Sequence, residues 1–204
     1  MRVYFKGNIG VGKSTMINTL YNKFKKNNIK CEKILEPIDK WEKLLNYKYN
    51  INSHEIDILT NNYICFTLFN QRNIEYNKDT IYLIERDIDC SKAFISYTSK
   101  EAEEINNELI NEMLNILNFK YNDTKKYIIN ITIDDLQTVL NRIYFRNRIG
   151  EKNIDINYIT TINNKLKTFY TDLEINNSYD INNKNFNITV ELVYKKILNE
   201  FMNL

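Results

Sequence analysis

The sequence predicts an α/β fold in three layers, with a central parallel sheet and helices on both of its faces. Two observations carry this prediction. Short apolar runs that are typical of buried strands alternate along the chain with longer segments whose apolar residues recur every three or four positions, as on one face of a helix. No repeat and no flexible linker interrupts this alternation, so we expect one domain that spans residues 1–204.

The expected strands are short and follow one another in a regular order. They lie at residues 2–6, 30–35, 80–84, 126–131 and, more weakly, 179–181. The first of them contains the apolar run Val3-Tyr4-Phe5. Each strand is followed by at least one helical pattern, and a chain that alternates in this way builds a parallel sheet.

The expected helices are recognised by apolar residues at helical spacing. They lie at residues 13–27, near 41–45, at 54–73 and 100–119, from about 134, at 156–169 and at about 189–202. The first keeps Met16, Leu20 and Phe24 on one face. Ser53 is placed to cap the helix at 54–73, and Thr98-Ser99-Lys100-Glu101 is typical of a capping box at the start of the next helix.

Charge and cysteine content exclude several classes of function. The 28 basic and 26 acidic residues give a net charge of +2, so we expect no nucleic-acid partner. The three cysteines are widely spaced and odd in number, which predicts neither a disulfide framework nor a zinc site. No apolar run is long enough to span a membrane, and the chain begins with a strand instead of a signal peptide. We therefore expect no membrane partner and a cytoplasmic location.

The glycine-rich segment after the first strand has the pattern of a phosphate-binding loop. It is Gly7-Asn8-Ile9-Gly10-Val11-Gly12-Lys13-Ser14, followed by Thr15. Glycines allow backbone N–H groups to turn toward an anion, and the next helix directs the positive end of its dipole at the same point. Lys13 would reach the β- and γ-phosphates of a nucleoside triphosphate, and the Ser14 hydroxyl would bind the Mg²⁺ ion that bridges them.

Charged residues also follow the second and third strands. Glu36-Pro37 comes after the strand at 30–35, and Glu85-Arg86 comes after the strand at 80–84. Because ligands of such folds bind at the carboxyl ends of the strands, we expect these residues to meet the phosphate-binding loop in one crevice. The single histidine, His54, lies among polar residues at the expected start of a helix and is interpreted as a surface residue, so any proton acceptor should be a carboxylate.

These segments together resemble the deoxynucleoside kinase family, the group that contains insect deoxynucleoside kinase, deoxycytidine kinase and mitochondrial thymidine kinase. The residues that carry the resemblance are the phosphate-binding loop, Glu36-Pro37-Ile38-Asp39-Lys40-Trp41, Glu85-Arg86-Asp87, and Arg142, Arg146, Arg148 and Glu151 in a polar, lid-like segment at about 142–153. The resemblance implies a P-loop kinase fold and an ATP-dependent deoxynucleoside 5′-kinase that uses Mg²⁺. It also implies a homodimer.

The resemblance further implies the roles of the reacting residues. Glu36 matches the base that takes the proton of the nucleoside 5′-hydroxyl, and Arg86 matches the arginine that holds the 5′ end and the incoming phosphate. Glu85 would help Ser14 to hold Mg²⁺. The lid residues match arginines that clamp the transferring phosphoryl group; they are Arg142, Arg146 and Arg148.

A second group of residues is implied in recognition of the deoxynucleoside. Glu151 and Tyr49 match the pair that binds the 3′-hydroxyl, with Tyr47 as the alternative to Tyr49. Asn61 aligns with the glutamine that reads the base, and it keeps the donor and acceptor of an amide on a shorter side chain. Gln71 is the alternative to Asn61.

Three positions near the base and the metal depart from the family pattern. Asp87 replaces the usual serine and would place extra negative charge near the metal. Trp41 matches one aromatic wall of the base, but the other wall has no exact counterpart, since Phe94 is one position early and Ile95 occupies the aligned position. Ser91 stands where family members have either a small residue or an acid, and the small residue resembles members that accept thymidine or other pyrimidine deoxynucleosides.

Two other functions fit parts of the sequence. Thymidylate kinases share the loop, an acid-arginine pair and an arginine-bearing lid, but they usually follow Glu-Pro with Gly-Gly-Thr. Their acceptor already carries a phosphate, so Glu36 would meet no 5′-hydroxyl. A non-catalytic nucleotide-binding protein would keep the loop without turnover, with Asp87 and Asn61 as signs of drift. At single positions, Trp41 could be a core residue, and the lid arginines could be a solvated basic loop.

Overall fold

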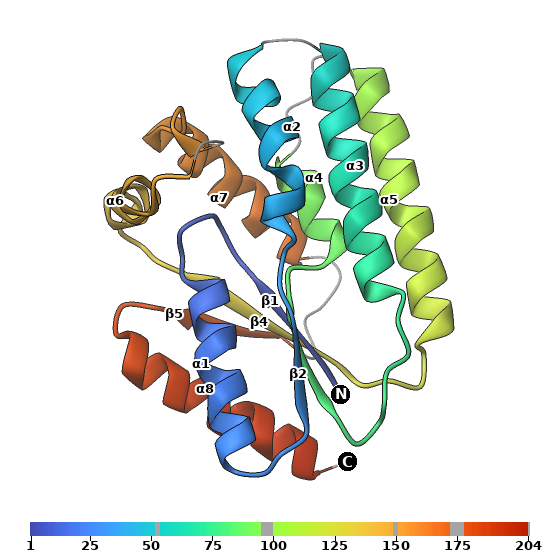
Figure 1. The fold of residues 1–204 in the computed structure, drawn as a ribbon, viewed down its shortest axis with the longest axis vertical. Coiled ribbons are helices and arrows are strands. Elements are labelled where there is room, and N and C mark those ends of the chain that lie inside the picture. The colour runs from blue at the N-terminus through green and yellow to red at the C-terminus, as the bar shows by residue number, and fades with distance from the viewer. Residues whose placement is uncertain (52–53, 95–99, 149–150, 172–177, 204) are drawn as a thin grey trace.

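Five parallel strands form the central sheet, in the order β2-β3-β1-β4-β5 (Figure 1). The strands are β1 (Arg2–Lys6), β2 (Cys31–Ile34), β3 (Ile81–Glu85), β4 (Lys126–Thr132) and β5 (Ser178–Asn182). The structure is a computed structural model that describes residues 1–51, 54–94, 100–148, 151–171 and 178–203. In the middle of the sheet, Val3 of β1 lies opposite Leu83 of β3 and Tyr127 of β4. The predicted α/β fold with a parallel sheet is confirmed.

Helices cover both faces of this sheet (Figure 1). In the described residues they are α1 (Lys13–Lys26), α2 (Ile38–Asn50), α3 (His54–Arg72), the 3₁₀ helix η1 (Ile88–Cys90), α4 (Ser91–Phe94), α5 (Lys100–Lys120), α6 (Leu136–Arg146), α7 (Ile156–Thr171) and α8 (Phe186–Met202). Helices α1 and α8 pack together on one face, whereas α2, α3 and α5 lie side by side away from them. None of the described helices combines the length and the apolar composition needed to cross a bilayer.

Alternate residues of the strands point to opposite faces of the sheet and enter different cores. Val3 and Leu83 are buried under α1 and α8 in the largest apolar cluster. Tyr4 points to the other face, where Tyr76 from the segment after α3 packs against it. A separate cluster that includes Trp41 joins α2, α3 and α5. The sheet is therefore covered on both faces, and its carboxyl edge is left for the site.

Several elements differ from the sequence prediction, among them α2, β3 and α8. The helix expected near 41–45 is the longer α2, which begins one turn earlier and adds Ile38 to the cluster that Trp41 and Leu45 form with α3 and α5. Strand β3 is shifted by one residue, from the expected 80–84 to Ile81–Glu85. Helix α8 begins three residues earlier than expected, since the Asn185 side chain caps it by accepting a hydrogen bond from Ile188 N at 3.3 Å. The residues expected to cap α3 and α5 lie outside the described residues; they are Ser53, Thr98 and Ser99.

Candidate functional site

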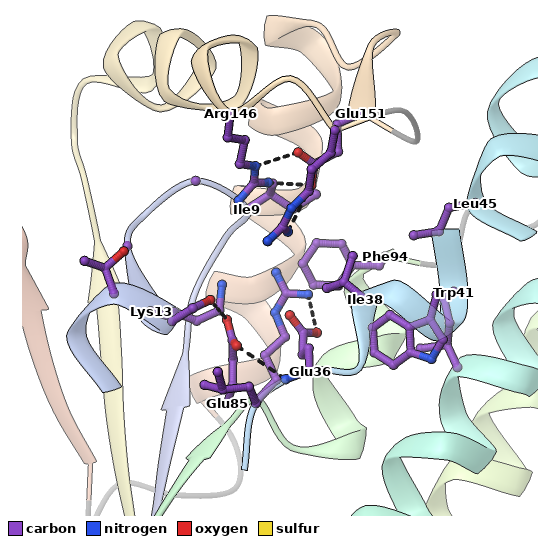
Figure 2. A pocket seen from close by; sticks show the side chains of 18 of the residues that line it. Ile9, Lys13, Glu36, Ile38, Trp41, Leu45, Glu85, Phe94, Arg146 and Glu151 are labelled. Carbon is purple, nitrogen blue, oxygen red and sulfur yellow. Dashed lines mark hydrogen bonds and ion pairs between the residues drawn. The ribbon is translucent and has the colours of Figure 1, made fainter. Parts of the chain in front are cut away.

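A cavity of about 610 Å³ lies at the carboxyl end of the sheet, where the segments after β1, β2 and β3 meet. Figure 2 shows Lys13 and Glu85 on one side of it, Trp41 and Leu45 on the other, and Glu36 between them. Most residues predicted for the site line this cavity; they are Ile9, Gly10, Gly12, Lys13, Ser14, Thr15, Glu36, Trp41, Asn61, Glu85, Arg86, Ser91, Arg142, Arg146, Arg148 and Glu151. Residues far apart in the sequence thus meet where ligands of parallel α/β folds bind.

Three residues of the phosphate-binding loop are not among the described residues that line the cavity; they are Gly7, Asn8 and Val11. They contribute to the conformation of the loop and to its packing. A Cβ atom at Gly7 would lie 2.3 Å from the carbonyl oxygen of Ile131, so the loop can approach β4 this closely only with glycine. The Asn8 side chain donates to the carbonyl of Ile159 at 2.9 Å and accepts from Ile9 N at 2.8 Å. These contacts tie the loop to β4 and α7.

The start of α1 is built to receive an anion. Gly12 precedes the helix with a left-handed backbone, φ 96°, and no side chain caps the helix at this end. The first N–H groups of a helix have no acceptor within the helix, so those of α1 lie at the cavity with the positive end of the helix dipole. This geometry supports the predicted phosphate-binding role of the loop.

Lys13 carries its charge in a buried position. Its Nζ donates to the carbonyl of Asn8 at 2.7 Å. Burial lowers the pKa of Lys13 to about 8, and the positive charge of Arg86 acts in the same direction, while Glu85 and Glu36 oppose it. A bound phosphate would supply the missing negative charge beside this ammonium group.

Ser14 and Glu85 bring two oxygen ligands together beside the loop. The Ser14 hydroxyl donates to Glu85 Oε1 at 2.7 Å, and Glu36 N donates to Glu85 Oε2 at 3.4 Å. Mg²⁺ prefers oxygen ligands and usually combines one or two protein groups with waters and substrate phosphates. No cluster of three or more His, Cys, Asp or Glu able to hold a metal occurs in the part of the chain that the structure describes. The pair therefore fits Mg²⁺ that arrives with a nucleotide.

Glu36 and Arg86 form an ion pair in the middle of the cavity. Arg86 Nη1 lies 2.9 Å from Glu36 Oε1, and both side chains are nearly buried. Pro37 directs the chain after Glu36 through an inverse γ-turn, with φ −81° and ψ 59°, in which Ile38 N donates to the carbonyl of Glu36 at 2.9 Å. Arg86 itself has a left-handed backbone, φ 57°. A proton acceptor and a cation thus lie side by side.

The lid arginines contact Glu151 in this structure. Helix α6 ends at Arg146, and Asn147 follows with a left-handed backbone, φ 47°. Arg146 donates from Nε to Glu151 Oε2 at 2.6 Å and from Nη2 to Oε1 at 2.5 Å, and Arg148 Nη1 lies 3.8 Å from the same Oε1 (Figure 2). Arg142 lines the cavity one turn earlier on α6. Residues predicted for phosphate and for sugar are therefore paired with each other.

The far end of the cavity combines apolar walls with a few buried polar groups. Trp41 is both a core residue and a wall, and its Nε1 donates to Thr67 Oγ1 at 2.7 Å. Asn61 is buried on α3, and Ser91 forms a hydrogen bond with the Cys65 thiol, whose pKa burial raises to about 11. Such a lining is typical of a site for an aromatic ring with polar edges. The side chains of Tyr49 and of Ile95 lie outside the described part of the structure.

Phe94 places an aromatic ring in the cavity, where alignment by position leaves one aromatic wall unassigned. It is the last residue of α4 and lines the cavity. The guanidinium carbon of Arg86 lies 4.0 Å from the centroid of its ring. Figure 2 shows Phe94 beside Ile38, between the Arg146–Glu151 pair and Trp41. The site therefore has aromatic side chains from both α2 and α4.

Asp87 does not add charge beside Ser14 and Glu85, the residues expected to hold Mg²⁺, and the expectation from sequence was wrong on this point. It is not among the described residues that line the cavity; its buried carboxylate lies 2.9 Å from Lys126 Nζ and accepts from Ile88 N at 2.9 Å. Burial alone would raise the pKa of Asp87, but the ammonium groups of Lys126 and Lys6 and these hydrogen bonds hold it well below its usual range. The charge of Asp87 is therefore neutralised mainly by Lys126.

Two residues that follow β5 line the cavity and were not predicted. Asn183 is buried, and it donates from its backbone N to the carbonyl of Thr132 at 2.8 Å and from Nδ2 to the carbonyl of Val11 at 2.9 Å. Phe186 begins α8. Their position after a parallel strand is the signal that could have revealed them, but that strand was expected only weakly.

Comparison with known proteins agrees with this site. The family model for deoxynucleoside kinases matches residues 3–204. A search of curated proteins found no match. The match to the family extends from the first strand to the last helix, so it includes every element that contributes to the cavity.

The buried Lys13 predicts that phosphate binding takes up a proton at alkaline pH. A bound polyphosphate would raise the lowered pKa of Lys13, so above pH 8 binding must protonate the amine, and affinity should fall as the pH rises from 8 to 9. Calorimetric titration with Mg²⁺-ATP in buffers of different ionisation enthalpy measures this uptake. We expect close to one proton at pH 9, almost none at pH 7, and none at either pH for Lys13→Met. Equal heats in all buffers at pH 9 would contradict the assignment.

Proposed function

Because the chain belongs to the deoxynucleoside kinase family, we propose that it transfers the γ-phosphoryl group of ATP to the 5′-hydroxyl of a deoxynucleoside, with thymidine or another pyrimidine deoxynucleoside as the preferred acceptor. Kinases of this family use ATP as the phosphate donor, generally with Mg²⁺. The observation that carries the proposal is the position of Glu36, a nearly buried carboxylate between the phosphate-binding loop and the apolar end of one cavity.

In the proposed reaction, the triphosphate lies on the loop and the deoxynucleoside lies between Trp41 and Phe94. The 5′-hydroxyl then points to Glu36, which accepts its proton while the oxygen bonds to the γ-phosphorus and ADP leaves. Arg86 lies beside Glu36, so it can hold the same phosphoryl group as the proton departs. Positioning by these groups supplies most of the rate enhancement, since phosphoryl transfer needs little covalent help.

Charge on the transferring group is met from several sides in this proposal. Lys13 approaches from the loop, and the lid arginines approach from α6 and the segment after it. Ser14 and Glu85 would hold Mg²⁺, which neutralises negative charge on the phosphates when bound. Arg146 must exchange its contact with Glu151 for a contact with phosphate, which leaves Glu151 for the sugar 3′-hydroxyl. We propose the segment at about 142–153 as the lid of a single domain.

Two alternatives are less well supported by the geometry. A thymidylate kinase would bring a phosphate monoester to the acceptor site, so the nearly buried carboxylate of Glu36 would have no 5′-hydroxyl to deprotonate. A protein that only binds nucleotides has no need of the Glu36–Arg86 ion pair or of carboxylate and hydroxyl together at Ser14 and Glu85.

Transfer of labelled phosphate from Mg²⁺-ATP tests the proposed function. The acceptors are thymidine, deoxycytidine, deoxyadenosine, deoxyguanosine and thymidine monophosphate, each with the purified protein. We expect monophosphate products from deoxynucleosides, with pyrimidines first. Product from thymidine monophosphate alone would move the assignment to thymidylate kinase. If the protein binds Mg²⁺-ATP but gives no product with any acceptor, the remaining interpretation is a non-catalytic nucleotide-binding protein.

Glu36→Gln should lower kcat by about 10²- to 10⁴-fold, because the amide cannot accept the proton of the 5′-hydroxyl. The KM for the deoxynucleoside should change much less, since the size and hydrogen-bonding reach of the side chain are kept. Glu42→Gln is the matched control, since it neutralises an exposed carboxylate on α2, the helix that follows Glu36. A kcat for Glu36→Gln equal to that of the control would exclude Glu36 as the base.

Asn61→Ala should raise the KM for the preferred deoxynucleoside about tenfold and reduce discrimination among bases. The reason is that a base edge would lose a buried hydrogen-bonding partner worth about 1 to 2 kcal/mol. Asn70→Ala removes an exposed amide from the same helix and serves as control. The same labelled-phosphate assay measures both. If Asn61→Ala retains the KM and the base preference of the control, the base does not bind against α3.

We also propose a homodimer that pairs through α3 and α5. These neighbouring helices expose large apolar side chains, among them Leu59 and Phe66 on α3 and Ile105 and Phe119 on α5. Several such side chains on adjacent helices are typical of an interface. Sedimentation velocity should give the mass of two chains for the protein and of one chain for Phe66→Glu, while Phe145→Glu on α6 should remain dimeric. A wild-type mass of one chain would refute this interface.

A further inference from the structure

Arg72, the last residue of α3, is completely buried although it carries a positive charge. Its Nη2 donates to two successive carbonyls, that of Glu85 at 2.5 Å and that of Arg86 at 2.9 Å. Its Nη1 donates to Gln71 Oε1 at 2.7 Å. In the described part of the chain no carboxylate pairs with this guanidinium. Burying a charge without a counter-ion is unfavourable. The presence of Arg72 at this position therefore needs a reason, and its hydrogen bonds to the two carbonyls provide one.

The two carbonyls belong to a strained turn. Arg86 has φ 57°, a left-handed conformation that is unfavourable for a residue with a Cβ atom. The turn separates two side chains of the site, since Glu85 contacts Ser14 and Arg86 contacts Glu36. In this conformation one nitrogen of Arg72 donates to both carbonyls.

We propose that Arg72 is a positioning residue that fixes the left-handed turn at Arg86, and so sets the direction in which Glu85 and Arg86 enter the cavity. Arg72 touches no substrate in this role; it acts through the backbone of its two neighbours. The inference rests on the proposed phosphoryl transfer for its kinetic consequence. Loss of the clamp lets the turn relax to a right-handed conformation, which moves both side chains from their places.

Arg2 provides a matched control at the other end of the same sheet. It is also buried, and its Nη2 also donates to two carbonyls, those of Tyr121 at 3.0 Å and Thr124 at 3.2 Å. Both arginines leave Nε without a partner. Arg2 begins β1, whereas the cavity lies at the carboxyl ends of the strands. The two residues therefore make the same kind of contact, and only one of them is near the site.

The test compares Arg72→Gln with Arg2→Gln in urea denaturation, in Mg²⁺-ATP binding and in the labelled-phosphate assay. We expect both variants to lose stability, and we expect only Arg72→Gln to weaken Mg²⁺-ATP binding, because Glu85 contacts Ser14 beside the phosphate-binding loop. Only Arg72→Gln should lose kcat, by about 10- to 100-fold, as expected when reacting groups move by about an ångström. Arg72→Lys keeps the charge but lacks the several N–H donors of a guanidinium group, so its kcat should lie between those of the wild type and Arg72→Gln.

The outcomes are separable from those of the proposed function. If the wild type turns over and Arg72→Gln keeps its kcat, or if Arg2→Gln loses as much kcat as Arg72→Gln, the positioning role is refuted. If Arg72→Gln does not fold, Arg72→Lys decides on the same criteria. If the wild type binds Mg²⁺-ATP but phosphorylates no deoxynucleoside, the proposed function fails instead.

Discussion

The ion pair between Glu36 and Arg86 is the contact on which the arrangement of the cavity depends. Its 2.9 Å distance requires the ends of β2 and β3 to lie next to each other, and the sheet order places them so. Parallel pairing also brings the end of β1, with its phosphate-binding loop, to the same edge. Because neighbouring parallel strands end together, three short segments of different sequence reach one cavity without a long connection between them.

The residues of this edge could be predicted from sequence because each follows a recognisable strand. The spacing of the glycines identifies the phosphate-binding loop, and Glu36 and Glu85 come directly after apolar runs. Phe94 could not be placed in the same way. Its backbone position depends on the turn at Arg86 and on the short elements after it, and a shift of one residue on a helix turns a side chain by about 100°. The left-handed φ at a non-glycine residue has no signal in sequence, so the role of Arg72 was invisible too.

Asp87 shows a second limit of sequence reasoning. The sequence gives the number of charged residues near a motif, but it does not show which way each charged side chain points. Glu85 faces Ser14, whereas the carboxylate of Asp87, two residues later, lies with Lys126 of β4. The compensating cation comes from a strand more than thirty residues away, so only the pairing of β1 with β4 brings it close. The charge of Asp87 is therefore compensated by Lys126 and by the backbone of the turn.

Three carboxylates of the cavity already have side-chain partners within the protein. Glu36 holds Arg86, Glu151 holds Arg146, and Glu85 accepts from Ser14. Under the proposed roles, each of these carboxylates serves the acceptor or the metal, and both arginines serve the phosphoryl group. When substrates bind, contacts within the protein are then replaced by contacts with the substrates, and this replacement reduces the net gain in affinity. In return, the charged side chains are held in position before the substrates arrive. Since Glu36 and Arg86 are partners, a phosphoryl group that draws Arg86 away also leaves Glu36 free to accept a proton. The base thus becomes available at the point in the cycle when the donor is in position.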